Sequence, residues 1–120
     1  MQIKQINLPE VETISNNFLY QNKVLKDISL PNVKIIESDF LGRNKDLEVC
    51  ILPSLVVTGS DFLLRNKVLK EFHAPKLEEI GFFFLYYNEE LEKFNAPSLK
   101  YLPGGFLWYH TSRHLFVDPR

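Results

Sequence analysis

The chain has 120 residues, which allows one domain at most. Its 14 basic and 15 acidic side chains give a net charge of −1. The chain as a whole therefore does not attract nucleic acid or an anionic membrane, and we expect no nucleic-acid partner.

Neither a membrane span nor a secretory signal is evident. No apolar run approaches the roughly 18 residues that a membrane span needs, and the opening stretch MQIKQINLPE lacks an apolar signal core. We expect no membrane insertion. The chain would then be cytoplasmic, or exported by a signal-independent route, unless a signal has been removed. Cys50 is the single cysteine, which excludes an intrachain disulfide and fits a reducing compartment or a cysteine-poor secreted protein.

An eight-residue sequence recurs at a fixed spacing. It is FLYQNKVL from residue 18, FLGRNKDL from 40, FLLRNKVL from 62, FLYYNEEL from 84 and, less well kept, FLWYHTSR from 106, always 22 residues apart. On this period the chain divides into units that begin at residues 3, 25, 47, 69 and 91, with a partial unit from 113. Such repeats are typical of solenoids, so we treat residues 1–120 as one repeat domain.

Each unit opens with a short predicted strand, because its fourth and sixth positions are apolar and alternation with period two indicates one buried face. Where the fourth position grows from Ile to Phe, the sixth shrinks from Leu to Ala, as a close-packed interior requires. We call equivalent positions of successive units a column. These two columns are Ile6, Ile28, Cys50, Phe72, Phe94 and Phe116, and Leu8, Leu30, Leu52, Ala74 and Ala96.

A proline ends each predicted strand, because it cannot donate to a strand ladder. Two more apolar columns then predict a second, partly extended side that faces inward. Polar residues precede the first three Phe-Leu pairs, at 16–17, 38–39 and 60–61, and resemble helix N-caps, so we expect a short 3₁₀ or α turn there. The columns of the second side are Val11, Val33, Leu55, Leu77 and Leu99, and Ile14, Ile36, Thr58, Ile80 and Leu102.

One polar residue type is kept beside the apolar columns. It predicts a ladder in which each asparagine amide binds backbone groups of its own and the neighbouring coil, groups that would otherwise be buried without partners. A row of ligand-binding amides is the alternative. The column is Asn22, Asn44, Asn66 and Asn88, followed by His110.

The unit L-x-x-I-x-L-P-x-V-x-x-I-x-x-x-F-L-x-x-N resembles a leucine-rich repeat and is similar to the BspA-like class found in bacterial surface proteins and some protists. The resemblance covers residues 3–119. It implies an α/β fold: a right-handed solenoid with a parallel β-sheet on one face and short 3₁₀ or α turns on the other. It also implies an often cell-surface protein that binds macromolecules. The chain departs from that class in three ways. It has Phe-Leu where the class has a small residue followed by Phe, it has Asn where the class has Cys, and its unit is slightly shorter.

The third and fifth positions of each unit point outward from the predicted sheet. Strands about 4.8 Å apart would make this face roughly 25 Å long, small but usable for a protein partner. Val49 and Ile51 are apolar in mid-sheet, either as scattered surface residues or as the centre of a binding site. The strand face comprises Gln5, Asn7, Asp27, Ser29, Val49, Ile51, Glu71, His73, Lys93 and Asn95, continued by Leu115 and Val117.

Aromatic residues replace polar or small ones in the later units. Phe82 and Phe83 stand where Ser60 and Asp61 stand one unit earlier. Interface cores favour aromatic residues, whereas the alternative is that these rings pack on one another and on the final segment RHLFVDPR. The predicted aromatic patch is Phe82, Phe83, Tyr86, Tyr87, Tyr101, Trp108 and Tyr109.

The ends of the repeat carry weak signals for the polar caps that solenoids need, and no separate cap precedes Ile3. An uncovered end exposes apolar side chains and an unpaired strand. We therefore expect either a homodimer, formed through an end or through the aromatic patch, or a piece of a longer array.

The sequence contains no catalytic or metal-binding motif. Cys50 stands in a core column, and the three histidines fall in different columns, unlike clustered zinc ligands. The outward carboxylates of Asp27 and Glu71 lie two strands apart, roughly 10 Å, which is wider than a glycosidase pair usually needs. We predict no cofactor, no metal and no enzymatic activity. The sequence favours a binding module for a protein partner; the alternative is a spacer or stalk segment of a larger surface protein.

Overall fold

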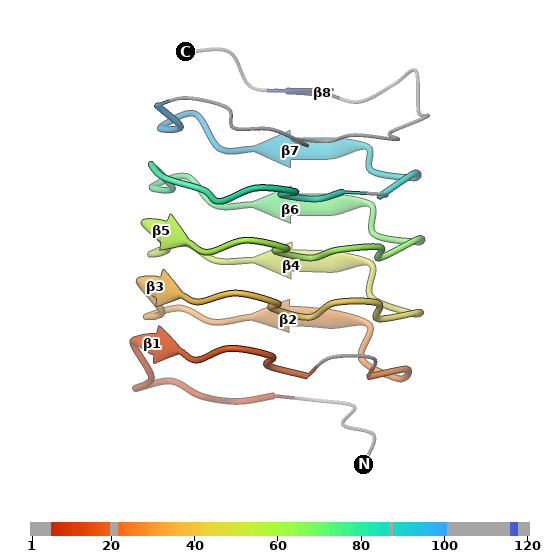
Figure 1. Cartoon of the computed structure of the whole chain (residues 1–120), viewed down its shortest axis with the longest axis horizontal. Coiled ribbons are helices and arrows are strands. Elements are labelled where there is room, and N and C mark those ends of the chain that lie inside the picture. Colours follow the sequence, from red (N-terminus) through yellow and green to blue (C-terminus); the bar gives the residue numbers. More distant parts are fainter. Residues whose placement is uncertain (1–5, 20–21, 87, 101–115, 118–120) are drawn as a thin grey trace.

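The computed structural model describes residues 6–19, 22–86 and 88–100, and the backbone of 116–117 (Figure 1). Within these residues the chain winds as a solenoid, and each 22-residue turn, here called a coil, stacks on the next. The predicted solenoid architecture is therefore confirmed.

Two parallel β-sheets run along the solenoid (Figure 1). The smaller one contains β1 (Thr13–Ile14), β3 (Ile35–Ile36) and β5 (Val57–Thr58), and an isolated bridge from Val57 to Glu79 continues it into the next coil. It forms the second inward-facing side that the sequence predicts. The larger sheet contains, in spatial order, β2 (Asp27–Ser29), β4 (Val49–Ile51), β6 (Glu71–His73), β7 (Lys93–Asn95) and β8 (Phe116–Val117).

The last strand departs from the repeat alignment. Up to β7, partners in the larger sheet are equivalent positions of successive units, as in the pairing of Phe72 with Phe94. In β8, Val117 pairs with Phe94 and Phe116 pairs with Lys93, one residue further along than the repeat spacing. The backbone of β8 is therefore one residue out of register with the repeat alignment, which places Phe116 in the core column and Val117 on the strand face.

The apolar columns fill the interior, as the sequence predicts. Cys50 and Leu52 in one coil, and Phe72 and Ala74 in the next, are all fully buried, so the larger ring in the fourth position is matched by the smaller methyl in the sixth.

Phenylalanine rings stack from coil to coil within this core. The rings of Phe18, Phe40, Phe62 and Phe84 lie nearly parallel, with centroids 5.6, 5.2 and 5.0 Å apart. Phe72 meets Phe62 edge-on at 5.7 Å. Both arrangements are favourable for aromatic rings, so the Phe-Leu pairs of the described coils act as core residues.

The segment that carries the Phe-Leu pairs contains no helix in any described coil. The predicted 3₁₀ or α turns, and with them the α/β class, are thus wrong for this part of the chain. Alternate residues have left-handed backbone conformations: φ is 61° at Asp39, 51° at Leu41 and 55° at Arg43. A helix requires consecutive right-handed residues, so this alternation excludes one.

Backbone hydrogen bonds between coils replace the local bonds of a helical turn. The N–H of Leu41 donates to the carbonyl of Phe18 in the preceding coil at 2.9 Å, and the N–H of Asp39 donates to Ser60 in the following coil at 3.0 Å. These bonds satisfy backbone groups that would otherwise be buried without partners. They offset the cost of about 1–2 kcal/mol for each left-handed non-glycine residue.

Thr58 provides a test of how the core is packed. It stands in a column otherwise held by Ile14, Ile36 and Ile80, and its buried hydroxyl has no hydrogen-bond partner. We predict that T58V raises the free energy of unfolding by about 1 kcal/mol, because it removes an unpaired hydroxyl at nearly constant volume. Urea denaturation measures this change. T58S keeps the hydroxyl and loses a methyl group, so it should be destabilising; a T58V protein no more stable than wild type would contradict the assignment.

Candidate functional site

The asparagine column forms a ladder between coils. The amide of Asn66 donates to the carbonyls of Leu41 at 2.9 Å and Leu64 at 3.4 Å, and its oxygen accepts the N–H of Asn44 at 3.1 Å. The amides of Asn44 and Asn88 donate to the equivalent pairs of carbonyls. All four asparagines are buried. The amide donors of Asn44, Asn66 and Asn88 bind backbone carbonyls of the fold, so these three residues do not form an exposed row of amides for a ligand.

The strand-face residues of β2, β4, β6 and β7 come together on one side of the larger sheet. Asp27, Val49, Glu71 and Lys93 are aligned in one row, and Ser29, Ile51, His73 and Asn95 in the next. Ile51 remains 38% exposed, which leaves an apolar side chain in mid-sheet. Asn7 is exposed but lies outside the strands, and Gln5 and Leu115 lie outside the described residues.

Glu71 and His73 are joined by a side-chain hydrogen bond on the strand face. Nε2 of His73 lies 3.1 Å from Oε1 of Glu71. This hydrogen bond is the main reason that the pKa of Glu71 is below its usual value. Burial acts in the opposite direction, and the charge of Lys93 adds a smaller lowering effect. The pair gives the middle of the face a fixed polar group beside Ile51.

The described part of the chain contains no group of three or more His, Cys, Asp or Glu residues that could hold a metal ion. In the same residues, no helix is long and apolar enough to cross a membrane.

Cys50 is the one thiol in the chain, and it is fully buried on β4. Burial raises its pKa far above the usual value, which keeps it protonated and therefore poorly nucleophilic. We predict that Cys50 does not react with a thiol reagent such as DTNB in the native protein and reacts fully in urea. Absorbance of the released thiolate measures both states. Rapid labelling of the native protein would contradict the burial of this thiol.

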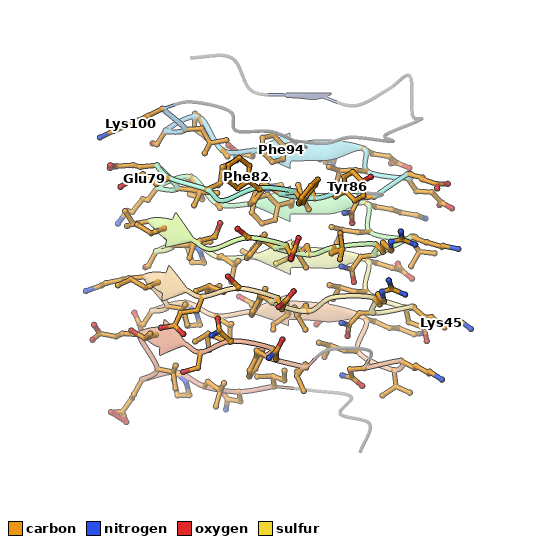
Figure 2. All side chains as sticks on the ribbon, in the orientation of Figure 1. Lys45, Glu79, Phe82, Tyr86, Phe94 and Lys100 are labelled. Carbon is orange, nitrogen blue, oxygen red and sulfur yellow. The ribbon has the colours of Figure 1, made fainter. Side chains whose placement is uncertain are left out.

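The aromatic patch lies on the side of the solenoid that bears the left-handed turns. Phe82 is 59% exposed and Phe83 is 41% exposed, whereas Tyr86 is half-buried. The rings of Phe83 and Tyr86 meet edge-on, with centroids 5.0 Å apart. Figure 2 shows Phe82 and Tyr86 on the ribbon that runs in front of the larger sheet. The other predicted members, Tyr87, Tyr101, Trp108 and Tyr109, lie outside the described residues.

The backbone under the patch is tightly constrained. A Cβ added at Gly81 would lie 2.6 Å from the carbonyl carbon of Gly59 in the preceding coil, so a larger residue would force the coils apart. Phe83 has φ of 60°, in the column where Asn17 and Asp61 have φ of 63° and 58°. Asparagine and aspartate tolerate this conformation better than a bulky residue does. Phe83 is therefore both exposed and strained.

Two stacked carboxylates lie beside the patch. Asp39 and Asp61 occupy the same column in adjacent coils and are half-buried. Burial raises the pKa of Asp61, and the neighbouring charge of Asp39 and a hydrogen bond with it raise this pKa further. Because the folded-state pKa is raised, ionisation of Asp61 removes stability as the pH rises through that pKa.

This pair generates a pH-dependent prediction. We expect D61N to raise the free energy of unfolding at pH 7 by about 0.5 kcal/mol, after allowing for solvent screening, because it removes the repulsion at a left-handed position that suits asparagine. The gain should shrink near pH 3, where Asp61 itself is protonated. Thermal denaturation across this pH range measures the difference. If D61N raises the free energy of unfolding equally at pH 7 and pH 3, the backbone conformation alone, and not the charge of Asp61, is responsible.

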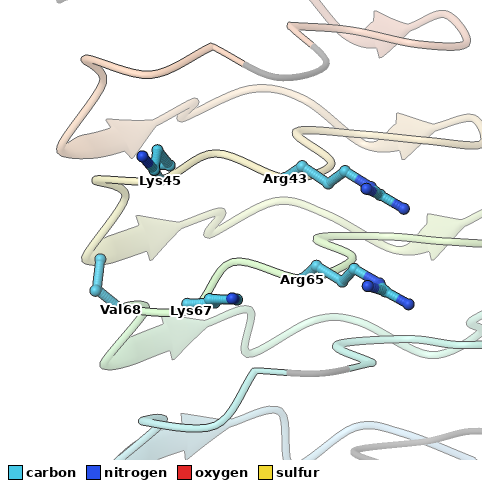
Figure 3. Close-up of a pocket in the computed structure, with 5 residues that line it drawn as sticks. All are labelled: Arg43, Lys45, Arg65, Lys67 and Val68. Carbon is cyan, nitrogen blue, oxygen red and sulfur yellow. The ribbon is translucent and has the colours of Figure 1, made fainter.

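The sequence reasoning missed two surface features. Ile35 on β3 is 46% exposed and adds an apolar side chain to the smaller sheet. Arg43, Lys45, Arg65 and Lys67 surround a surface pocket of about 380 Å³ (Figure 3). The recurrence of Arg and Lys on either side of the asparagine column, in FLGRNKDL and FLLRNKVL, was the available signal for this basic pocket.

Comparisons with known proteins give no match to this chain, whether with family models, with curated proteins or with solved structures.

Proposed function

We propose that this protein is a non-catalytic binding module, a leucine-rich-repeat-like scaffold that contacts a protein partner mainly through Phe82 and Phe83. The observation that carries the proposal is that these two rings are exposed at positions where earlier coils have polar residues.

The fold itself does not account for this substitution. Ser38 and Ser60 precede Phe82 in its column, and these smaller residues accompany the same turn in the earlier coils. Burying a phenylalanine side chain contributes about 1.5–3 kcal/mol, which an exposed ring largely forgoes, and the left-handed conformation of Phe83 costs about 1–2 kcal/mol. A partner that covers both rings would gain the apolar burial that the isolated chain lacks. Aromatic anchors of this kind often dominate binding at protein interfaces.

The scaffold beneath the patch is suited to binding. Inter-coil bonds from Leu85 to Phe62 at 2.9 Å and from Asp61 to Phe82 at 2.9 Å tie the patch to the preceding coil. The Asn88 amide adds a bond to the carbonyl of Leu63 at 2.8 Å. A surface held in this way loses little conformational entropy when a partner binds, so more of the contact energy remains as affinity.

The test uses residues that the chain itself places in the same columns. In F82S/F83N, serine comes from positions 38 and 60 and asparagine from position 17, so the variant should keep the fold and lose the rings. We expect its melting temperature to stay close to that of wild type, because relief of strain at residue 83 offsets loss of the contact with Tyr86. We expect the affinity for a protein partner to fall at least about tenfold, as for interface hot spots.

The partner would first be captured by cross-linking to the wild-type chain, then purified and titrated by calorimetry against both proteins. The matched variant V49T/I51T makes the strand face more polar and leaves the aromatic patch intact. Loss of affinity only in V49T/I51T would move the interface to the strand face. Undiminished binding by both variants would contradict this proposal, and the absence of any specific partner would favour the spacer alternative. Light scattering on the same samples tests whether the partner is a second copy of the chain.

A further inference from the structure

All the charged residues that line the basic pocket are positive. The described residues around it are Arg43, Lys45, Arg65, Lys67 and Val68, and none of them is acidic (Figure 3). Its volume of about 380 Å³ falls within the range of pockets that hold small molecules. The basic pocket lies along the asparagine column, apart from Phe82, and does not depend on the proposed protein-binding patch.

The four cations are positioned by the stacking of two coils. Arg43 and Arg65 are equivalent residues of adjacent coils, as are Lys45 and Lys67, so each pair starts about 4.8 Å apart at the backbone. Figure 3 shows the two arginine side chains running side by side in the same direction. The N–H of Arg43 donates to the carbonyl of Leu64 at 2.7 Å, which fixes the backbone from which its side chain extends.

Charge is arranged differently elsewhere on the solenoid. In one neighbouring column the side-chain charge alternates between positive and negative from coil to coil, through Lys26, Glu48, Lys70 and Glu92. Such alternation is favourable, whereas like charges directly opposite each other on neighbouring strands are destabilising. The basic pocket places like charges together in two columns at once.

We propose that the basic pocket binds a small organic anion with two tetrahedral oxyanion groups, either phosphates or sulfates. Each guanidinium can hold one such group through two parallel hydrogen bonds, and the lysines add charge at the other side of the basic pocket. Val68 lies beside Lys67 and adds an apolar contact for the carbon framework at the lysine side of the basic pocket (Figure 3). A nucleic-acid strand fits less well, because Tyr87 and Glu89 end the two cationic columns in the next unit and the net charge is −1.

Calorimetric titration of the full chain tests the proposal with four probes. Fructose bisphosphate and a sulfated heparin disaccharide carry the two candidate oxyanions, inorganic phosphate carries one group only, and a short oligonucleotide represents a polymer. At low salt, about 50 mM, we expect at least one of the first two to bind about tenfold more tightly than inorganic phosphate, and this affinity to fall as salt is added. The tighter of the two identifies the oxyanion.

The variant R43Q/R65Q should weaken this binding at least about tenfold, since it removes both guanidinium groups. Glutamine is the residue at position 21 of the same column, and an unchanged melting temperature will confirm folding. K26Q/K70Q removes the same charge from the alternating column and should change the affinity less than about twofold. If R43Q/R65Q does not fold, K45Q/K67Q replaces it. The proposal fails if neither fructose bisphosphate nor the heparin disaccharide binds, if both variants weaken binding equally, or if the oligonucleotide binds most tightly.

Discussion

Hydrogen bonds between successive coils are the interaction on which the whole structure depends. The two sheets, the left-handed turns and the asparagine ladder all contribute donors that bind a neighbouring coil, as Leu63 does to Phe40 and Asn66 does to Leu41. Backbone bonds that close within one coil, such as that from Leu77 to Ala74 at 3.1 Å, are a minority among the described residues. Stacking therefore determines the local conformation, and the apolar columns align because the backbone bonds place equivalent residues above one another.

The same constraint explains which features the sequence could predict. Alternation around Cys50 and Phe72 predicts a buried strand face, and the period of 22 predicts a solenoid, because both depend on side chains that recur in register. The turns were assigned wrongly because Asp39 suits a helix N-cap and a left-handed residue equally well. Only the bond from Asp39 to Ser60 in the next coil decides between them. The shift at Val117 was missed because it depends on strand pairing.

The candidate sites follow a related division. The aromatic patch could be recognised from the sequence, because Phe82 and Phe83 interrupt columns that are otherwise polar. Their exposure and the strain at Phe83 required the structure. The basic pocket could be recognised only from the structure, because Arg43 and Arg65 are 22 residues apart in sequence and neither is unusual as a single residue. Only the stacking of coils shows that two basic columns border one concavity.

Glycine at positions 59 and 81 has a consequence for how such a chain can change over time. At each, a Cβ would lie closer than 3.0 Å to the preceding coil, so these two positions allow no side chain without movement of the coils. The exposed column beside them holds Ser38, Ser60 and Phe82 in successive coils, so it accepts both small and large side chains. Mutations can thus alter the outer surface of one coil at a time while the separation between coils stays constant. Such a solenoid can acquire a new contact surface without having to evolve a new fold.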